Sequence, residues 1–200
     1  MKFLTDQFEE VHIELRRPWL FPDLRADLLA KAVWYYGPRR TGRLDCLRML
    51  MSDGSLCTVL YRLMRALRRW RLGPPAAVVY KLNALLTRAV IGRGAEFGPG
   101  LVILHSVGVI VNTSVRAGGN VILEGSVTLG AEKKQSPTLG DNVFIGGGAK
   151  VIGGVRLGNR ARIGANAVVI SDVPDGATAV GIPAKVVRVR QANDGMASNE

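Results

Sequence analysis

The 200-residue chain has only two cysteines, two histidines and few aromatic residues, which make up 6% of it. Cys46 and Cys57 fall in segments with a helical pattern, so we predict reduced core thiols in a cytoplasmic protein rather than a disulfide framework. No stretch approaches the roughly 20 uninterrupted apolar residues of a membrane span. The start, MKFLTDQFEE, lacks the apolar region of a secretory signal, which favours the same location.

Acidic residues are scarce beside basic ones, because 27 lysines and arginines face 16 aspartates and glutamates. Residues 1–88 hold 16 basic and 8 acidic residues, against 11 and 8 in residues 89–200. A pI near 10.4 fits nucleic acid, an anionic membrane surface or an anionic cofactor as partner. Because no RNA-binding motif with interleaved aromatics is present, we predict no nucleic-acid partner and keep peripheral membrane contact as a minor alternative.

The first 88 residues have the apolar spacing of helices. Residues 55–72, SLCTVLYRLMRALRRWRL, are predicted to form an amphipathic helix with arginines on one face and these apolar residues on the other: Leu56, Leu60, Leu63, Leu67 and Trp70. The preceding DGS supplies capping residues, and GPP at 73–75 ends the helix. Residues 21–36, 42–51 and about 75–87 are also predicted to be helical. We therefore predict a small α-helical domain over residues 1–88.

From residue 89 the apolar period becomes six, which no helix produces. The series shifts by two residues once and is interrupted at residues 131–137, and it runs through Ile91, Phe97, Ile103, Val109, Ala117, Leu123, Leu129, Leu139, Ile145, Val151, Leu157, Ile163 and Val169. Short repeats of this kind stack as a solenoid whose coils bury one another's apolar residues. With three hexads to a triangular coil, residues 91–170 predict four to five coils, and AEKKQSP at 131–137 loops out.

The predicted fold class is therefore mainly β, with a parallel β-helix domain over residues 89–190 after the helical domain. The polar, aperiodic residues 191–200 are predicted to be a disordered tail. A solenoid leaves exposed faces, and closure around a three-fold axis would cover them. We expect a homotrimer or a dimer of trimers.

Several motifs resemble the hexapeptide-repeat acyltransferases with a left-handed parallel β-helix, and among them the serine acetyltransferases. The motifs lie within residues 88–188 and read IGRGAEFGPGLVILHSVGVIVN, VTLG, LGDNVFIGGGAKVIGGVRLG, RIGANAVVISDVP and AVGIPAKVVR. The resemblance implies an acetyl-CoA-dependent O-acetyltransferase without a metal, in which His105 is the general base. Histidine can take a proton from an acceptor hydroxyl near neutral pH and return it to the departing CoA thiolate.

The resemblance also implies which residues bind acetyl-CoA and stabilise the reacting thioester. A backbone N–H at Gly130 or Ala131 would stabilise the oxyanion. The CoA arm would lie between neighbouring subunits, where small residues leave room for it, namely Gly147, Ala149 and Ala165. Three cations are candidates for binding its phosphates, namely Lys150, Lys185 and Arg188.

The acceptor side departs from the family pattern. Val90 and Leu104 replace the acids that the family carries fifteen residues before and immediately before the catalytic histidine. A backbone carbonyl, Glu96 or Glu124 is then left to orient the ring. The loop motif that contacts the serine carboxylate is replaced by Gln135, Ser136 and Pro137. Asp53 is a candidate for a third substrate-binding acid or, alternatively, for a helix N-cap.

Free serine carries two charges, and most of the residues that would pair with them are absent. The predicted acceptor is therefore L-serine or a sugar hydroxyl of an exopolysaccharide precursor. Two other functions fit the fold: a scaffold or partner subunit that has lost catalysis and would not bind CoA, and a γ-class carbonic anhydrase. The anhydrase needs three histidines on a metal, whereas this chain has only His12 and His105.

Overall fold

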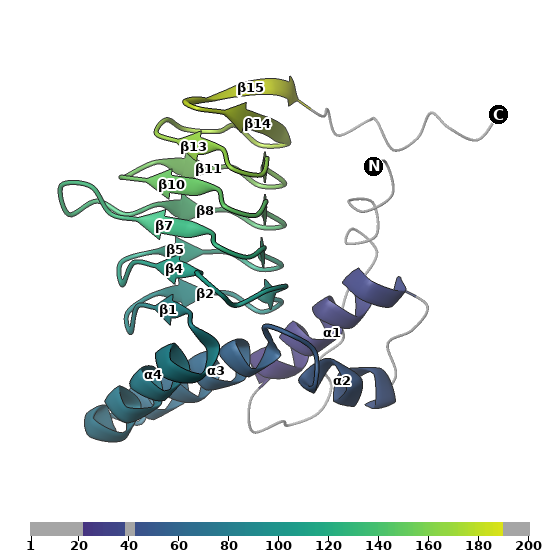
Figure 1. Ribbon diagram of the computed structural model, residues 1–200, viewed down its shortest axis with the longest axis vertical. Helices are drawn as coiled ribbons and strands as arrows, with labels where there is room; N and C mark the ends of the chain where they lie inside the picture. Colours follow the sequence, from purple (N-terminus) through teal and green to yellow (C-terminus); the bar gives the residue numbers. More distant parts are fainter. Residues whose placement is uncertain (1–21, 39–42, 190–200) are drawn as a thin grey trace.

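The protein, described by a computed structural model over residues 22–38 and 43–189, has four helices packed against one end of a parallel β-helix (Figure 1). The predicted mainly β hexapeptide solenoid is confirmed. The predicted tail at 191–200 lies outside the described residues, as do residues 1–21 at the start of the predicted helical domain.

The four predicted helical segments are confirmed as α1 (Pro22–Tyr36), α2 (Arg43–Leu50), α3 (Ser55–Arg69) and α4 (Gly73–Thr87). The GPP sequence does not separate two helices as a linker. It begins α4, where the prolines occupy the first turn and have no amide hydrogen to leave unpaired.

The apolar residues predicted for one face of α3 are not the residues that the helix buries, although Leu67 packs against the core. Leu56 and Trp70 are 48% and 58% exposed. The buried positions of the helix are Ser55, Cys57, Thr58, Tyr61, Arg62 and Met64. Tyr61 and Arg62 bond to backbone groups of the first coil, so the helix turns a partly polar face to the β-helix. Apolar spacing alone could not reveal that choice.

The β-helix has three parallel sheets that meet at its corners. The first contains β1 (Val90–Ile91), β4 (Ile110–Val111), β7 (Thr128–Gly130), β10 (Lys150–Ile152) and β13 (Val168–Val169). The second contains β2 (Glu96–Phe97), β5 (Arg116–Ala117), β8 (Thr138–Leu139) and β11 (Arg156–Leu157). The third contains β3 (Val102–Ile103), β6 (Ile122–Leu123), β9 (Phe144–Ile145), β12 (Arg162–Ile163), β14 (Ala177–Gly181) and the antiparallel β15 (Ala184–Val189).

The six-residue series points into this prism. Twelve of its thirteen members are buried, and Ala117 is partly buried against them. Stacking removes these side chains from water, and each buried aliphatic group stabilises the fold by about 1.5–3 kcal/mol relative to an exposed one. The predicted excursion at 131–137 is also confirmed, since it joins β7 to β8 and projects from the side of the prism (Figure 1).

One corner is enlarged by the two-residue shift in the repeat. β3 begins at residue 102 and β4 at residue 110, a step of eight, whereas β4, β5 and β6 begin at 110, 116 and 122. The two extra residues belong to the segment 104–109, which contains His105. The wider turn carries this side chain out of the apolar core.

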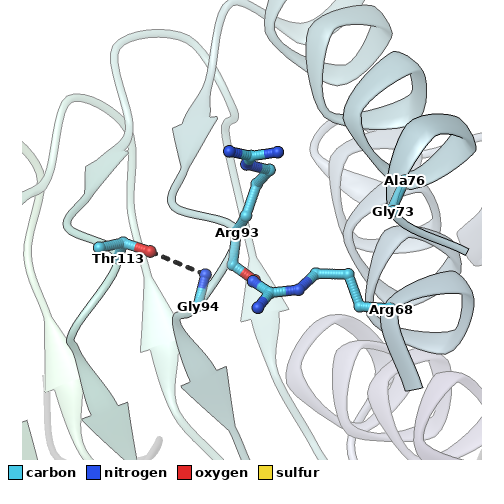
Figure 2. A pocket seen from close by; sticks show the side chains of 6 residues that line it. All are labelled: Arg68, Gly73, Ala76, Arg93, Gly94 and Thr113. Carbon is cyan, nitrogen blue, oxygen red and sulfur yellow. Dashed lines mark hydrogen bonds between the residues drawn. The ribbon is translucent and has the colours of Figure 1, made fainter. Parts of the chain in front are cut away.

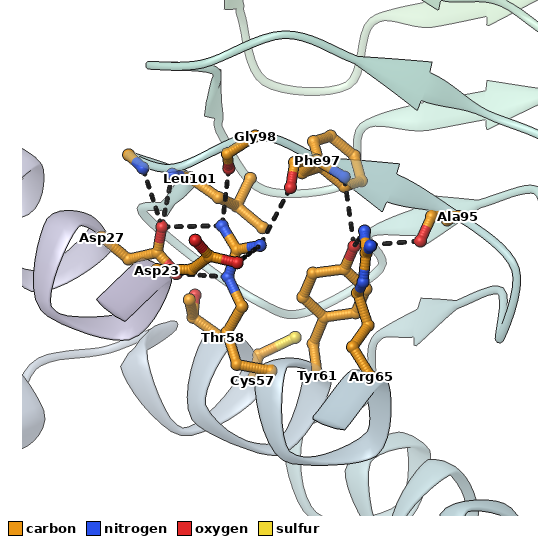
Figure 3. Close-up of polar contacts among 12 residues, drawn as sticks. Asp23, Asp27, Cys57, Thr58, Tyr61, Arg65, Ala95, Phe97, Gly98 and Leu101 are labelled. Atoms are coloured by element: carbon orange, nitrogen blue, oxygen red, sulfur yellow. Dashed lines mark hydrogen bonds and ion pairs between the residues drawn. The ribbon is translucent and has the colours of Figure 1, made fainter. Parts of the chain in front are cut away.

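A buried ion pair joins the helices to the first coil (Figure 3). Arg62 on α3 donates from Nε and Nη2 to the two carboxylate oxygens of Asp27 on α1, at 2.7 and 2.8 Å. It also donates to the carbonyls of Phe97 and Gly98 at 2.9 and 2.6 Å. The Asp27 carboxylate accepts from the amides of Gly100 and Leu101 at 2.9 and 2.8 Å.

Tyr61 adds a second link beside this pair. Its hydroxyl donates to the Ala95 carbonyl at 3.0 Å and accepts from the Phe97 amide at 3.2 Å. These bonds satisfy buried backbone groups at the open end of the solenoid, where there is no preceding coil to pair with. They therefore hold α3 across that end in a defined direction.

Candidate active site

His105 is a surface residue with one fixed ring nitrogen. Its side chain is 65% exposed, and Nδ1 lies 2.8 Å from Oδ2 of Asp53. Among the described residues Nε2 has no hydrogen-bond partner. A satisfied core histidine would have neither the exposure nor the open nitrogen, so this ring is placed to meet a molecule from outside.

The Asp53 contact sets the tautomer of the ring. The pKa of Asp53 lies below its usual value, mainly because of the hydrogen bond with His105 and also because of the Gly54 amide and the charge of Lys31. An ionised carboxylate only accepts hydrogen bonds, so Nδ1 must carry the hydrogen and the lone pair is left on Nε2. Nε2 is therefore the nitrogen that can accept a proton.

Asp53 reaches His105 because the backbone approaches β3 closely. Gly54 has a φ of 75°, and a Cβ on it would stand 2.2 Å from the Ile103 carbonyl oxygen. Only glycine fits there. Gly54 also occupies the N-cap position of α3, which has no side-chain cap, so the N-cap interpretation of Asp53 is wrong.

Lys31 stabilises the turn at Asp53 through hydrogen bonds from a buried ammonium group. It lies on α1, is only 3% exposed, and donates from Nζ to the carbonyls of Asp53 and Ile103 and to the Ser55 hydroxyl. Burial lowers the pKa of Lys31 to about 8. One ammonium group thus ties the Asp53 turn to the strand that precedes His105. Nothing in the local sequence around residue 31 indicates this role.

Neither glutamate considered as an orienting group contacts the ring. The Glu96 carboxylate lies 3.4 Å from Nε of Arg116, and Glu124 accepts from the Gly147 amide at 2.7 Å. The position fifteen residues before His105 holds the partly exposed Val90, and Leu104 is buried against Ala30, Val102 and Ile122. Asp53, from another part of the chain, therefore supplies the carboxylate that these positions lack.

A column of small residues rises above His105 on the same edge of the prism. A Cβ on Gly125 would lie 3.3 Å from the His105 Cβ. The Gly148 amide donates to the Gly125 carbonyl, and the Asn166 amide donates to the Gly147 carbonyl, which links successive coils. Gly147 and the exposed Ala165 belong to this edge. Ala149 does not line it, because its side chain is fully buried in the core.

The three predicted phosphate-binding cations are exposed. Lys150 begins β10 just beyond the column, and its Nζ donates to the Gly148 carbonyl at 3.2 Å. Lys185 and Arg188 lie on β15, the last strand of the prism. An anion that extended from His105 along the column would therefore meet Lys150 first and the β15 cations at the far end.

The remaining predicted site residues lie on a different edge. His105 precedes β4, whereas Gly130 ends the parallel strand β7, so the two occupy opposite edges of the first sheet. Gln135 and Ser136 follow in the 131–137 loop, where the Ser136 hydroxyl bonds Oδ1 of Asn112 at 2.9 Å. One chain alone does not bring these groups to His105. A site that uses both sets must form between two subunits.

Within residues 22–38 and 43–189, no three side chains from histidine, cysteine, aspartate and glutamate are grouped closely enough to hold a metal ion. No helix in those ranges has the length and apolar character needed to cross a bilayer.

Comparisons with known proteins agree with the fold. Residues 136–171 match the family described as bacterial transferase hexapeptide (six repeats), so the protein is a hexapeptide-repeat β-helix transferase by class. Over 143 residues it is 41% identical to the serine acetyltransferase of Helicobacter pylori strain J99, covering 70% of this chain and 84% of that one. The chain therefore belongs to the serine acetyltransferase family.

Solved structures of this family superpose on most of the chain. The serine acetyltransferase of Neisseria gonorrhoeae matches with a TM-score of 0.77 and 30% identity, over 88% of this chain and 70% of that one. A serine acetyltransferase in complex with CoA matches with a TM-score of 0.72 and 28% identity, over 83% and 70% of the two chains.

Proposed function

We propose that this protein is an acetyl-CoA-dependent O-acetyltransferase in which His105 is the general base. The observation that carries the proposal is the exposed His105 ring with Nδ1 held by an ionised carboxylate and Nε2 open. Family membership and the relative solved with CoA support acetyl-CoA as the donor. A scaffold without catalysis has no need for an oriented, solvent-facing histidine, so the enzyme is favoured.

In the proposed reaction, Nε2 of His105 takes the proton of the acceptor hydroxyl while that oxygen attacks the thioester carbonyl. The new C–O bond gives a tetrahedral oxyanion, which a backbone N–H at Gly130 or Ala131 of a neighbouring subunit stabilises. The C–S bond then breaks, and the CoA thiolate recovers the proton from Nε2. Asp53 stabilises the imidazolium between the two transfers, as a positioning residue and not as a ligand of the acceptor.

We further propose that the active unit is an oligomer, as a homotrimer or a dimer of trimers. His105 with its small-residue column and Gly130 with the 131–137 loop lie on opposite edges of one chain. Edge-to-edge packing of like subunits around a closed axis would bring one set against the other.

For the acceptor, we propose a hydroxyl without a neighbouring ammonium group, such as a sugar hydroxyl of a polysaccharide precursor. The side chain before His105 is the buried Leu104, and the acid that is present, Asp53, is engaged by the ring. An ammonium group there would lose its hydration without gaining a counter-charge. L-Serine is the second candidate, favoured by the relatives, which are named serine acetyltransferases.

The test is release of CoA thiol from acetyl-CoA by the purified full chain, with L-serine, simple sugars, nucleotide sugars and short oligosaccharides as acceptors. We expect turnover with a sugar acceptor and little with serine. A preference for serine would contradict the proposed sugar acceptor but would leave the proposed acetyltransferase activity in place. If no acceptor gives turnover and the protein does not bind CoA, the enzyme proposal itself fails and the scaffold is the better description.

The Asp53→Asn variant tests the positioning role. The amide keeps the shape but no longer favours hydrogen on Nδ1 or stabilises imidazolium, so kcat is expected to fall by about 10- to 100-fold. This is less than the roughly 10⁴-fold loss for a buried triad aspartate, because Asp53 is 58% exposed and water screens its charge. The KM for acetyl-CoA should not change.

Glu96→Gln is the matched control for Asp53→Asn. It makes the same chemical change on an exposed carboxylate that pairs with Arg116 and does not contact His105. It should leave kcat at the wild-type value. A wild-type kcat in Asp53→Asn would show that this carboxylate does not assist the ring.

A further inference from the structure

An arginine-lined groove lies at the far end of α3 from Asp53. Its volume is about 740 Å³, and its wall contains Arg62, Arg65, Arg68 and Arg69 of α3 and the C-cap residue Trp70. The opposite wall comes from the first two coils and includes Arg93, Glu96 and Arg116. A smaller hollow of about 440 Å³ adjoins it and shares Arg68, Arg93 and Gly94 (Figure 2).

The groove has a positive charge that its own acids do not neutralise. Its two carboxylates each face a cation, with Asp23 lying 3.5 Å from Arg62 and Glu96 lying 3.4 Å from Arg116. Four arginines have no carboxylate partner among the described residues, namely Arg65, Arg68, Arg69 and Arg93. Like charges gathered in one concave site repel one another unless an anion enters.

The arginines are arranged from both sides of the groove. The Arg68 guanidinium donates to the Arg93 carbonyl, which joins the end of α3 to the first coil, and Figure 2 shows the Arg93 side chain extending from that coil beside the helices. Arg65 donates to the Tyr61 hydroxyl at 3.3 Å, which steadies it on the wall. Arg69 and Arg93 are exposed and have no side-chain hydrogen bond among the described residues.

We propose that this groove binds a soluble phosphate compound of the pyrophosphate type, such as a nucleoside diphosphate. Guanidinium groups bind phosphate oxygens in pairs through parallel N–H bonds, so four arginines match the charge and donor number of a diphosphate. The volume lies within the usual range for small-ligand sites. Trp70 on the rim is exposed and offers a flat face on which an aromatic base can stack.

This site is separate from the His105 centre. Asp53 precedes the first residue of α3, whereas Arg68 and Arg69 end the helix. Fifteen helical residues span about 22 Å. The proposal therefore stands whether or not the enzymatic activity proposed above is found.

The experiment is calorimetric titration of the full chain with inorganic pyrophosphate and with ADP, at about 0.15 M salt and without CoA. CoA is left out because it carries an adenosine diphosphate group and would itself compete for the proposed groove. The groove variant described next separates this site from the donor cleft. We expect both probes to bind and ADP to bind more tightly because of Trp70. Trp70→Ala should reduce the affinity for ADP to that for pyrophosphate.

The double variant Arg69→Gln with Arg93→Gln should weaken both probes by about tenfold or more, because each lost charge-assisted contact contributes to binding. Its thermal stability should match the wild type, since both side chains are exposed. The matched control removes two exposed cations elsewhere, as Lys81→Gln with Arg156→Gln, and should bind like the wild type.

Three results would overturn the proposal: no binding of pyrophosphate or ADP, binding by the groove variant that is no weaker than binding by its control variant, or binding only to phosphatidylglycerol vesicles. The last outcome would mean that the arginines serve an anionic lipid surface and not a soluble phosphate. Vesicles of phosphatidylglycerol with phosphatidylcholine are therefore the third probe, with pure phosphatidylcholine vesicles as their control.

Discussion

Replacing His105 by Ala is expected to lower kcat for acetyl transfer by about 10²- to 10⁴-fold, the usual contribution of a general base. Without Nε2, the acceptor hydroxyl must lose its proton to water as it attacks the thioester. The column of small residues and the cations beyond it remain in place, so binding of CoA should be unchanged. Steady-state thiol release and calorimetric binding of CoA measure the two effects separately.

The stability of the same variant provides the control. His105 is largely exposed and contacts Asp53 alone through its ring, so the free energy of unfolding should change by less than about 1 kcal/mol. Added imidazole should restore part of the activity, because the space left by the ring is open to solvent. A variant with wild-type kcat at every acceptor tested would exclude His105 as the base.

The Asp27→Asn variant is expected to lose about 3–5 kcal/mol of unfolding free energy, as do other chains in which one partner of a buried ion pair is removed. The amide is nearly isosteric, so the packing volume stays constant. Arg62, however, keeps its charge at a position that is almost completely buried, and the exposed Asp23 carboxylate, 3.5 Å away, is the carboxylate that remains beside it. Chemical denaturation at a fixed protein concentration measures the change, since oligomer formation would otherwise shift the midpoint.

Glu96→Gln is again the matched control, because its exposed pair with Arg116 should contribute less than about 1 kcal/mol. An Asp27→Leu, Arg62→Met double variant should be more stable than Asp27→Asn, since it removes both charges. It should not regain wild-type stability, because the Gly100 amide and the Phe97 carbonyl lose their partners. Equal stability of Asp27→Asn and Glu96→Gln would show that the buried pair is not required.

This ion pair also bears on the active site. Arg62 lies on α3, whose first turn follows Asp53, and Asp27 lies on α1 one turn before Lys31. The two helices that hold the Asp53 turn are therefore the helices that the pair fastens to the first coil. Asp27→Asn should consequently lower kcat as well as stability, through looser placement of Asp53 against His105.

Much of the architecture follows from local pattern. A six-residue period with one aliphatic position can bury its apolar side chains only in a stacked coil, so the β-helix and the 131–137 loop were predictable. The four helices follow from helical apolar spacing in the same way. His105 was identifiable by resemblance, because the surrounding motif is carried by neighbouring residues in one coil. These features depend on residues a few positions apart.

Three contacts depend on residues that are far apart in the chain. They are the Asp53 contact with His105, the Lys31 contact with Ile103 beneath the candidate site, and the ion pair that joins the helices to the first coil. Asp53 is 52 residues from His105, Lys31 is 72 from Ile103, and Asp27 is 35 from Arg62. No period relates such pairs, because they meet only once α3 lies across the end of the prism. The amino-acid sequence alone determined the repeat and singled out His105 as the candidate base. The tertiary structure decided which acid contacts that histidine, since the choice arises from helix packing and not from spacing.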